Sequence, residues 1–542
     1  MSDAQFAKAE KEFFDRTFAM NPLLASYLGL SEPYNRLMPD GGPQAVRESV
    51  VVLKEYLDSA NALDDRGLSP SRAIDKAVIR YAYDLARFAM DDQRSGRMNP
   101  DALGDFLAVC FLTIARDDAP PAERLAPLAA RLWELPVYLE QFRGRIGGER
   151  IAVPLFEAAV ETARAAPGFL MELCAYAGST EARAAEIFER SCRKATSAVE
   201  THLQWLHSLA SRASGDGAIG RDRFNELISI RRLGLDVPDI LDLAQGALDR
   251  GKSRLAQTSR ELASGLGPAD PRMRLHDGGA AGFEGVLATV RRRVAEARQF
   301  VVDEDLVHIP DGDAVEVVET PTFLRAFIPF AAVFPPGKFD RVRRGVCMVT
   351  RPPDDATLAA RFSDGEITNL VAHETYPGHF LQSFVTGFGS KTRWLVQAPE
   401  TVEGWAHYAE QLMLDRGFHD TAAARHAQAR ATVWRAARVV MDVRLACGEW
   451  SDEEAAAYMA REASLDAEGA RSEVRRARLQ PGRLLSYLVG KWLIARLRVE
   501  CRESLGDRFF ERAFHDAICA NGYLPHALLR PATLDALGIP GA

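Results

Sequence analysis

The sequence lacks several patterns that would place a protein in a common functional class. No run of about 18 apolar residues occurs, so we expect no transmembrane helix. No G-x-S-x-G surrounds a serine, and we also expect no phosphate-binding loop. The seven cysteines are scattered, odd in number and form no C-x-x-C pair. This usage is typical of reduced, mostly buried thiols rather than of a disulfide framework.

Positive charge is also in short supply. The 67 basic and 75 acidic residues give a net charge of −8, which excludes a general attraction to nucleic acid or to an anionic membrane surface. Acidic residues surround the two basic clusters at 341–344 and 475–478, so we interpret both as solvated faces. The first 18 residues, MSDAQFAKAEKEFFDRTF, contain no apolar core of signal-peptide length. We therefore expect no export signal and a cytoplasmic protein.

Helical periodicity dominates what is present. From residue 4 to about residue 265, runs such as SRAIDKAVIRYAYDLARFAMDD repeat apolar residues every three or four positions. Residues 308–352 differ, because VEVVET and GVCMVT are short β-rich runs that flank a Pro- and aromatic-rich segment. Helical patterning resumes near residue 364, after a capping sequence from Ser363 to Glu366. We expect a mostly α protein with a small inserted sheet or hairpin, divided into 1–265, 266–362 and 363–542.

The stretch VAHETYPGHFLQ, residues 371–382, has the composition of a metal site but an unusual spacing. In the zinc-peptidase motif H-E-x-x-H the second histidine follows the first by four residues. Here Pro377 stands at that position, and the next histidine after His373 is His379. Residues six apart on a regular helix point about 240° from each other. Pro377 and Gly378 can widen or break the helix, and we predict that a widened turn brings His379 back toward His373.

A third ligand is expected from the helix that begins near Glu400 and ends at Gly417. Glu403, His407 and Glu410 recur at four and three residues, so they share one face of that helix. Catalytic zinc takes three protein ligands and needs a nearby carboxylate that accepts a proton from water. Histidine and glutamate also suit Mn²⁺, Fe²⁺ or Co²⁺, so the metal is left open between these and zinc.

Two motifs resemble those of a known family. HETYPGHFLQ resembles the H-E-x-x-P-G-H-x-x-Q signature of the bacterial domain-of-unknown-function 885 family, and EGWAHYAE resembles its E-G-W-A-x-Y-x-E motif. Stretches 320–340, 481–498 and 514–530 are similar to further family segments. The family resembles the helical gluzincin peptidases, and its members are assigned as zinc-dependent peptidases. The resemblance implies two helical halves around a deep cleft.

The resemblance also implies roles for individual residues. His373 and His379 correspond to imidazole ligands of one Zn²⁺ ion, Glu403 to the carboxylate ligand and Glu374 to the general base. Tyr487 corresponds to a tyrosine that donates a hydrogen bond to the oxyanion of the reaction.

Four more residues are expected to support the ligands or to bind substrate. Gln382 is the last residue of the signature, and His407 stands where the family motif has an apolar residue, so it is a supporting residue or an alternative ligand. Glu410 is expected to orient a ligand or to lie on a solvated face. Arg483 is expected to bind the C-terminal carboxylate of a peptide.

The function implied is that of a zinc-dependent hydrolase that cleaves amide bonds of short peptides by means of an activated water. One alternative is a metal-dependent amidohydrolase that acts on a small non-peptide amide, and another is a peptide-binding protein without turnover. The β-rich run 342–350 is expected either to offer an exposed edge to an extended substrate or only to line the cleft. The sequence leaves substrate, cleavage mode and oligomeric state open.

Overall fold

The protein is described here by a computed structural model that covers residues 2–91, 98–116, 119–178, 182–265, 282–325, 328 and 330–540. It is mostly α with one small sheet, as expected, and it divides into two compact units. One unit comprises Met1–Gly217 and Pro336–Arg343, and the other comprises Ala218–Pro335 and Arg344–Ala542. The three ranges expected from the sequence cut the chain elsewhere. The first expected boundary adjoins residues 266–281, which lie outside the described residues.

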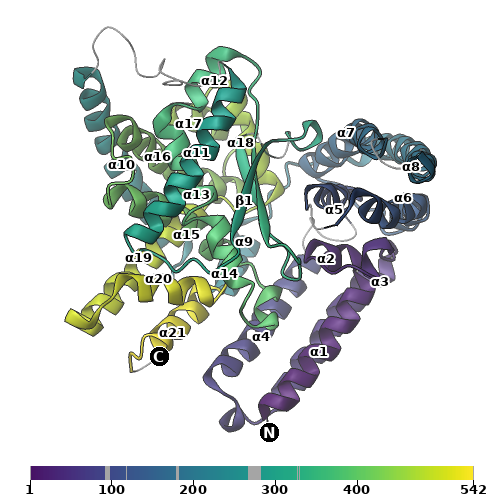
Figure 1. Cartoon of the computed structure of the whole chain (residues 1–542), viewed down its shortest axis with the longest axis horizontal. Helices are drawn as coiled ribbons and strands as arrows, with labels where there is room; N and C mark the ends of the chain where they lie inside the picture. The colour runs from purple at the N-terminus through teal and green to yellow at the C-terminus, as the bar shows by residue number, and fades with distance from the viewer. Residues whose placement is uncertain are drawn as a thin grey trace. The chain divides into compact units, whose positions relative to one another are not determined.

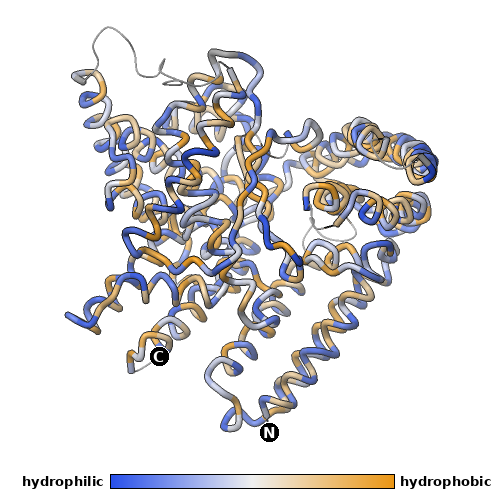
Figure 2. The backbone as a smooth tube through the Cα atoms, viewed as in Figure 1, coloured by the Kyte–Doolittle hydropathy of each residue, from blue (hydrophilic) through white to orange (hydrophobic). Residues whose placement is uncertain are grey.

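The first unit is built from amphipathic helices that pack on their neighbours in the sequence. Figure 2 shows hydrophobic and hydrophilic residues alternating along them, as the three- and four-residue spacing predicts. Helix α1 packs on α3, α3 on α4, and both α6 and α7 on α8. The helices are α1 (Ser2–Met20), α2 (Pro22–Tyr27), α3 (Pro43–Asn61), α4 (Pro70–Asp91), α5 (Gly104–Ala115), α6 (Pro121–Arg143), α7 (Val153–Ala177) and α8 (Ala182–Ser208).

The second unit holds the remaining helices and the sheet (Figure 1). Its long helices pack in pairs, α10 on α16 and α15 on α19, and α13 contacts both α15 and α16. The helices are α9 (Arg221–Arg231), α10 (Val237–Gly265), α11 (Phe283–Asp303), α12 (Asp355–Arg361), α13 (Asp364–Glu374), α14 (His379–Thr386), α15 (Pro399–Asp415), α16 (Ala422–Ala446), α17 (Asp452–Ala463), α18 (Ala467–Leu479), α19 (Ser486–Leu505), α20 (Glu511–Ala520) and α21 (His526–Ala536).

Two glycines allow α15 and α19 to approach closely. A Cβ atom on Gly404 of α15 would lie 2.4 Å from the backbone of Gly490, and one on Gly490 would lie 2.0 Å from the carbonyl oxygen of Glu400. Only glycine fits at such a backbone contact. Gly404, the glycine of the EGWAHYAE motif, is therefore required for helix packing. It allows the helices that carry Glu403 and Tyr487 to lie against each other.

The sheet contains three strands in the order β1-β3-β2, namely β1 (Ala314–Glu319), β2 (Ala331–Phe334) and β3 (Arg344–Val349). Strand β3 pairs in parallel with β1 and in antiparallel with β2. The two predicted β-rich runs are therefore strands. The suggestion that residues 342–350 offer an exposed edge is wrong, because β3 is the central strand and is almost wholly buried. Helix α11 packs on β1, and α13 and α14 pack on β2, so β2 is the edge strand that faces the motif helices.

Two short stretches match phosphate-binding patterns by letter, although the sequence was expected to hold no phosphate-binding loop. GALDRGKS, residues 246–253, fits G-x-x-x-x-G-K-[ST], but it lies inside α10, where helical hydrogen bonds occupy the backbone N–H groups that a phosphate loop would offer. Its Gly251 faces α16, where a Cβ atom would meet Val433 at 3.0 Å. GDGAIG, residues 215–220, fits G-x-G-x-x-G, but no strand of a named sheet precedes it in the described chain. Neither stretch forms a nucleotide site.

Within the described residues, no helix has the length and hydropathy that a membrane crossing requires.

Candidate metal centre

The motif helix is broken, and this differs from the predicted widened turn. Helix α13 starts at the expected cap, where the Ser363 side chain accepts a hydrogen bond from the Glu366 backbone at 3.4 Å, and it ends at Glu374. A second helix, α14, begins at His379. Between them the Tyr376–Pro377 peptide is cis, and a Cβ atom on Gly378 would lie 1.9 Å from the carbonyl oxygen of His373. Proline and glycine therefore end one helix and let the next begin against it.

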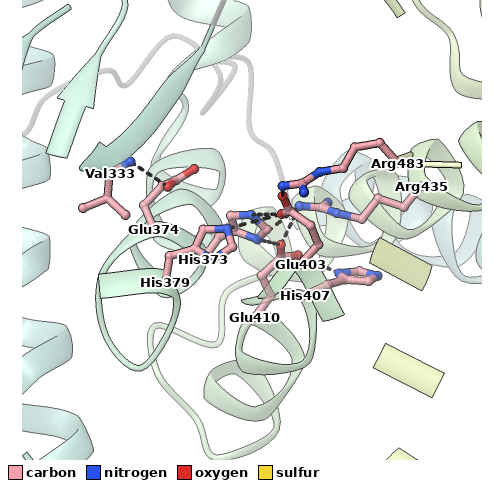
Figure 3. A network of polar contacts seen from close by, with 9 residues as sticks. All are labelled: Val333, His373, Glu374, His379, Glu403, His407, Glu410, Arg435 and Arg483. Atoms are coloured by element: carbon pink, nitrogen blue, oxygen red, sulfur yellow. Dashed lines mark hydrogen bonds and ion pairs between the residues drawn. The ribbon is translucent and has the colours of Figure 1, made fainter. Parts of the chain in front are cut away.

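Three side chains converge where α13, α14 and α15 meet (Figure 3). One ligand-type atom from each of His373, His379 and Glu403 lies within 4.8 Å of the other two. The Glu403 Oε2 atom lies 3.3 Å from His379 Nε2 and 4.0 Å from His373 Nε2. The expected imidazole pair and the expected carboxylate thus come together, although they come from three different helices.

The far side of His373 is held by a buried ion pair. Its Nδ1 atom lies 2.7 Å from Oε1 of Glu410, and the same oxygen accepts a hydrogen bond from Arg435 at 2.6 Å. Glu410 is fully buried, and although burial raises its pKa, Arg435 and the neighbouring histidines hold that pKa well below its usual range on balance. A charged carboxylate at Nδ1 favours the tautomer that keeps the proton there and leaves the Nε2 lone pair free.

His407 lies behind this pair rather than among the converging atoms. Its Nδ1 atom lies 3.3 Å from Oε2 of Glu410, and its side chain is fully buried. Burial and the charges of Lys491 and Arg435 lower the pKa of His407 well below its usual value, so the ring is neutral. His407 therefore contacts the carboxylate that holds His373, one residue removed from the cluster.

Glu374 lies beside the cluster and faces the edge strand. Its Oε2 atom accepts a hydrogen bond of 3.1 Å from the backbone N–H of Val333 in β2. Burial raises the pKa of Glu374 above the usual carboxyl range. In Figure 3, Glu374 and Val333 lie on one side of the histidines, and Arg483 and Arg435 lie on the other.

The second oxygen of Glu403 and the ring of His373 have further neighbours. Arg483, which lies in the turn before α19, donates a hydrogen bond of 2.9 Å to Glu403 Oε1. Burial raises the pKa of Glu403, but the hydrogen bond with His379 and the charges of His379 and Arg483 outweigh this effect. On balance the pKa of Glu403 lies far below its usual value. Tyr487, in the first turn of α19, stacks on His373 with 6.2 Å between ring centroids. Burial and the charge of Glu403 raise the pKa of Tyr487, so its hydroxyl keeps its proton.

Gln382 is fully buried in α14. Its Nε2 atom donates to the carbonyl oxygen of Thr401 at 3.2 Å and so ties α14 to the start of α15. The structure thus places Gln382 in helix packing near the cluster. Trp405 has a related position, because its Nε1 atom donates to the carbonyl oxygen of Pro377 at 2.8 Å and supports the break before α14.

Sequence reasoning missed Arg435, which holds Glu410. A signal for it exists in the helix TVWRAARVVMDVRLA, where Arg435 and Arg438 lie among mostly apolar residues. Arginines at positions that the helical period places in a core require buried acidic partners. Arg438 has one in Glu473 and Arg435 has one in Glu410, and all four residues are buried.

The fold and the cluster define a mostly α protein with a His/His/Glu group of metal-ligand type. The chain belongs to the family described as bacterial protein of unknown function, DUF885, whose model matches residues 22–532. A solved structure from Colwellia psychrerythraea, described as "the putative lipoprotein", has a TM-score of 0.84 at 17% identity and covers 99% of both chains. Another from Shewanella oneidensis, a "putative lipoprotein of unknown function", has a TM-score of 0.75 at 21% identity and covers 98% of this chain and 99% of its own. No curated protein matches.

The similar structures share the fold with this chain over nearly its whole length. Both are described as lipoproteins, a class of membrane-anchored proteins, and this contradicts the cytoplasmic location expected from the sequence. The expectation of a cytoplasmic protein was therefore wrong.

Proposed function

We propose that the chain is a metal-dependent hydrolase that cleaves amide bonds in short peptides, with His373, His379 and Glu403 as the metal ligands. The convergence of three ligand-type atoms within 4.8 Å, next to the half-buried side chain of Glu374, carries this proposal. A relation to the helical zinc peptidases would be consistent with the mostly α fold.

The donor set fits a zinc ion. Tetrahedral zinc with bonds of about 2.0–2.1 Å places neighbouring donor atoms roughly 3.3–3.4 Å apart. Glu403 Oε2 lies 3.3 Å from His379 Nε2 and 4.0 Å from His373 Nε2, which is close to this spacing. The Glu410 carboxylate on His373 Nδ1 is the partner that metal-bound histidines commonly have. Zinc held there would polarise a carbonyl group and lower the pKa of water.

Glu374 is assigned the role of general base. Its raised pKa and its position beside the ligands suit a carboxylate that takes a proton from water and passes it to the leaving amine. Tyr487 is assigned the role of hydrogen-bond donor to the negative oxygen that develops on the substrate, because it keeps its proton and stacks on His373. Edge strand β2, rather than β3, is the candidate for pairing with an extended substrate backbone.

The first experiment is elemental analysis of wild type, His379→Ala and His407→Ala, each purified without added metal. We expect near-stoichiometric zinc, or another divalent metal, in wild type and in His407→Ala, and loss of the metal in His379→Ala. Metal lost only with His407→Ala would move the second imidazole ligand to α15. If no variant holds metal after zinc is supplied, the hydrolase proposal fails.

Catalysis is tested with Glu374→Gln, which keeps the size of the side chain and removes its base. Metal-loaded wild type should cleave a pool of short peptides, and Glu374→Gln should bind metal normally while losing at least about 100-fold in kcat/KM, the low end for a general base. Equal activity of the two proteins would contradict the assigned role. A metal-loaded wild type that cleaves small non-peptide amides and no peptides would replace the substrate class in the proposal.

A further inference from the structure

Four arginines, namely Arg435, Arg438, Arg476 and Arg483, lie near Tyr487. The Cζ atoms of Arg435 and Arg438 lie 5.6 Å and 5.2 Å from the centre of its ring. Arg476 of α18 hydrogen-bonds to the Tyr487 side chain, and Arg483 precedes α19. Such a concentration of positive charge in an acidic protein requires negative partners.

Two of these arginines are paired with carboxylates that are buried with them. Arg438 makes a two-point contact with Glu473, with Nη2 at 2.8 Å from Oε1, and Arg435 contacts Glu410 at 2.6 Å. Their side chains are only 4% and 9% exposed. These two arginines are structural, because their charges are neutralised inside the unit.

Arg476 and Arg483 differ from this pair. Arg476 donates to the already engaged Glu473 at 3.2 Å, and Arg483 donates through Nη2 alone to Glu403. Their side chains are 35% and 37% exposed, so both are more accessible to solvent than those of Arg435 and Arg438. Around Tyr487, ion pairs join four guanidinium groups to three carboxylates, those of Glu403, Glu410 and Glu473. In these ion pairs the guanidinium groups outnumber the carboxylates by one, so one more negative group would balance their charge.

We propose that Arg476 and Arg483 bind the C-terminal carboxylate of a short peptide, so that the enzyme removes residues from the carboxyl end of its substrate. The inference rests on the proposed function, because it names the substrate class of the same site. Guanidinium groups present paired N–H donors that match a carboxylate. Arg483 is one hydrogen bond from Glu403, and a peptide residue spans about 3.3–3.6 Å, so one or two residues fit between the cleaved bond and the carboxylate.

The proposal predicts a preference that side chains cannot explain. A peptide with a free C-terminal carboxylate and the same peptide as a C-terminal amide differ in one negative charge.

Arg476 is the residue to change, because Arg483 contacts Glu403 and its loss would disturb a proposed ligand. Arg476→Gln removes the charge, Arg476→Lys keeps the charge without the planar fork, and Arg471→Gln on the exposed face of α18 is the matched control.

The experiment measures binding rather than turnover. A pool of N-acetylated hexapeptides, half as free acids and half as amides, is mixed with zinc-loaded Glu374→Gln protein, and the retained peptides are quantified by mass spectrometry after ultrafiltration. We expect at least 10-fold enrichment of free acids over amides. Arg476→Gln in the same background should reduce the enrichment below about 3-fold, Arg476→Lys should retain an intermediate value, and Arg471→Gln should match the parent.

The outcomes separate this inference from the proposed function. Equal retention of acids and amides, an acid preference that survives Arg476→Gln, or retention of neither pool overturns the carboxylate site. An acid preference that requires Arg476, in a protein whose wild type cleaves no amide, supports the carboxylate site and removes the hydrolase. Cleavage by wild type at internal bonds of amidated peptides supports the hydrolase and overturns the carboxy-terminal specificity.

Discussion

Glu410→Gln tests whether the buried carboxylate behind His373 prepares the metal centre. In the wild-type protein, His373 Nδ1 lies 2.7 Å from Glu410 Oε1. The substitution keeps an oxygen within reach of this nitrogen and removes the negative charge. Loss of an outer partner of this kind typically weakens metal binding by about 10–100-fold, which is about 1.4–2.7 kcal/mol. The substitution also removes the charged partner of Arg435, which contacts Glu410 at 2.6 Å and has a side chain that is only 9% exposed. Breaking a buried ion pair of this kind costs about 3–5 kcal/mol of stability.

Two measurements separate these effects. Competition with a chromogenic chelator reports zinc affinity, and urea denaturation of the metal-free protein, followed by the fluorescence of its seven tryptophans, reports stability. The matched control is Glu500→Gln, because the Glu500–Arg530 pair is exposed and such pairs contribute about 0–1 kcal/mol. Zinc affinity of Glu410→Gln within twofold of wild type, in a protein that remains folded, would refute the idea that Glu410 orients His373.

Three further outcomes are expected. Gly404→Ala should destabilise the protein by about 1–3 kcal/mol in thermal unfolding, because its Cβ meets backbone at 2.4 Å, whereas Gly168→Ala in open space should be neutral or stabilising; equal effects would contradict the close approach. Trp405→Phe should lower stability by about 1–3 kcal/mol and weaken zinc binding, since a buried carbonyl before α14 loses its donor; unchanged affinity would show that the break holds itself. Burial raises the pKa of Asp442 to about 6, so this carboxyl group binds more protons in the folded state than in the unfolded state. Its contribution to stability is therefore greatest below about pH 4, and it falls by about 3 kcal/mol as the pH rises through 6. The difference in unfolding free energy between wild type and Asp442→Asn should therefore change between pH 4 and 7, and a constant difference would refute the shift.

Local chemistry in the sequence predicted much of the candidate site. The helix from Ser363, the helix that carries Glu403 and the two β-rich runs follow from capping residues and periodicity, which act over a few neighbouring residues. Histidine and glutamate in a helical frame indicated a metal-type group, and His373, His379 and Glu403 do converge. Pro377 and Gly378 marked the place where the backbone departs from a regular helix, but not the form of that departure.

Other features depend on partners far away in the sequence. The helix breaks rather than widens, because Gly378 packs on the carbonyl of His373 and Trp405 of another helix holds the loop. Strand β3 is central because β1 and β2 pair on both of its sides, and a strand's sequence does not state how many neighbours it has.

The sequence by itself determined the helical class, the family and the identity of the side chains that form the cluster, because periodicity and motif spacing are properties of the chain. Only the tertiary structure decided that Arg435 supports Glu410, that His407 lies behind the cluster, and that β2 rather than β3 faces Glu374. The physical reason is that burial, charge pairing and strand order are set where several elements meet. No local pattern contains the distances between atoms that are tens of residues apart.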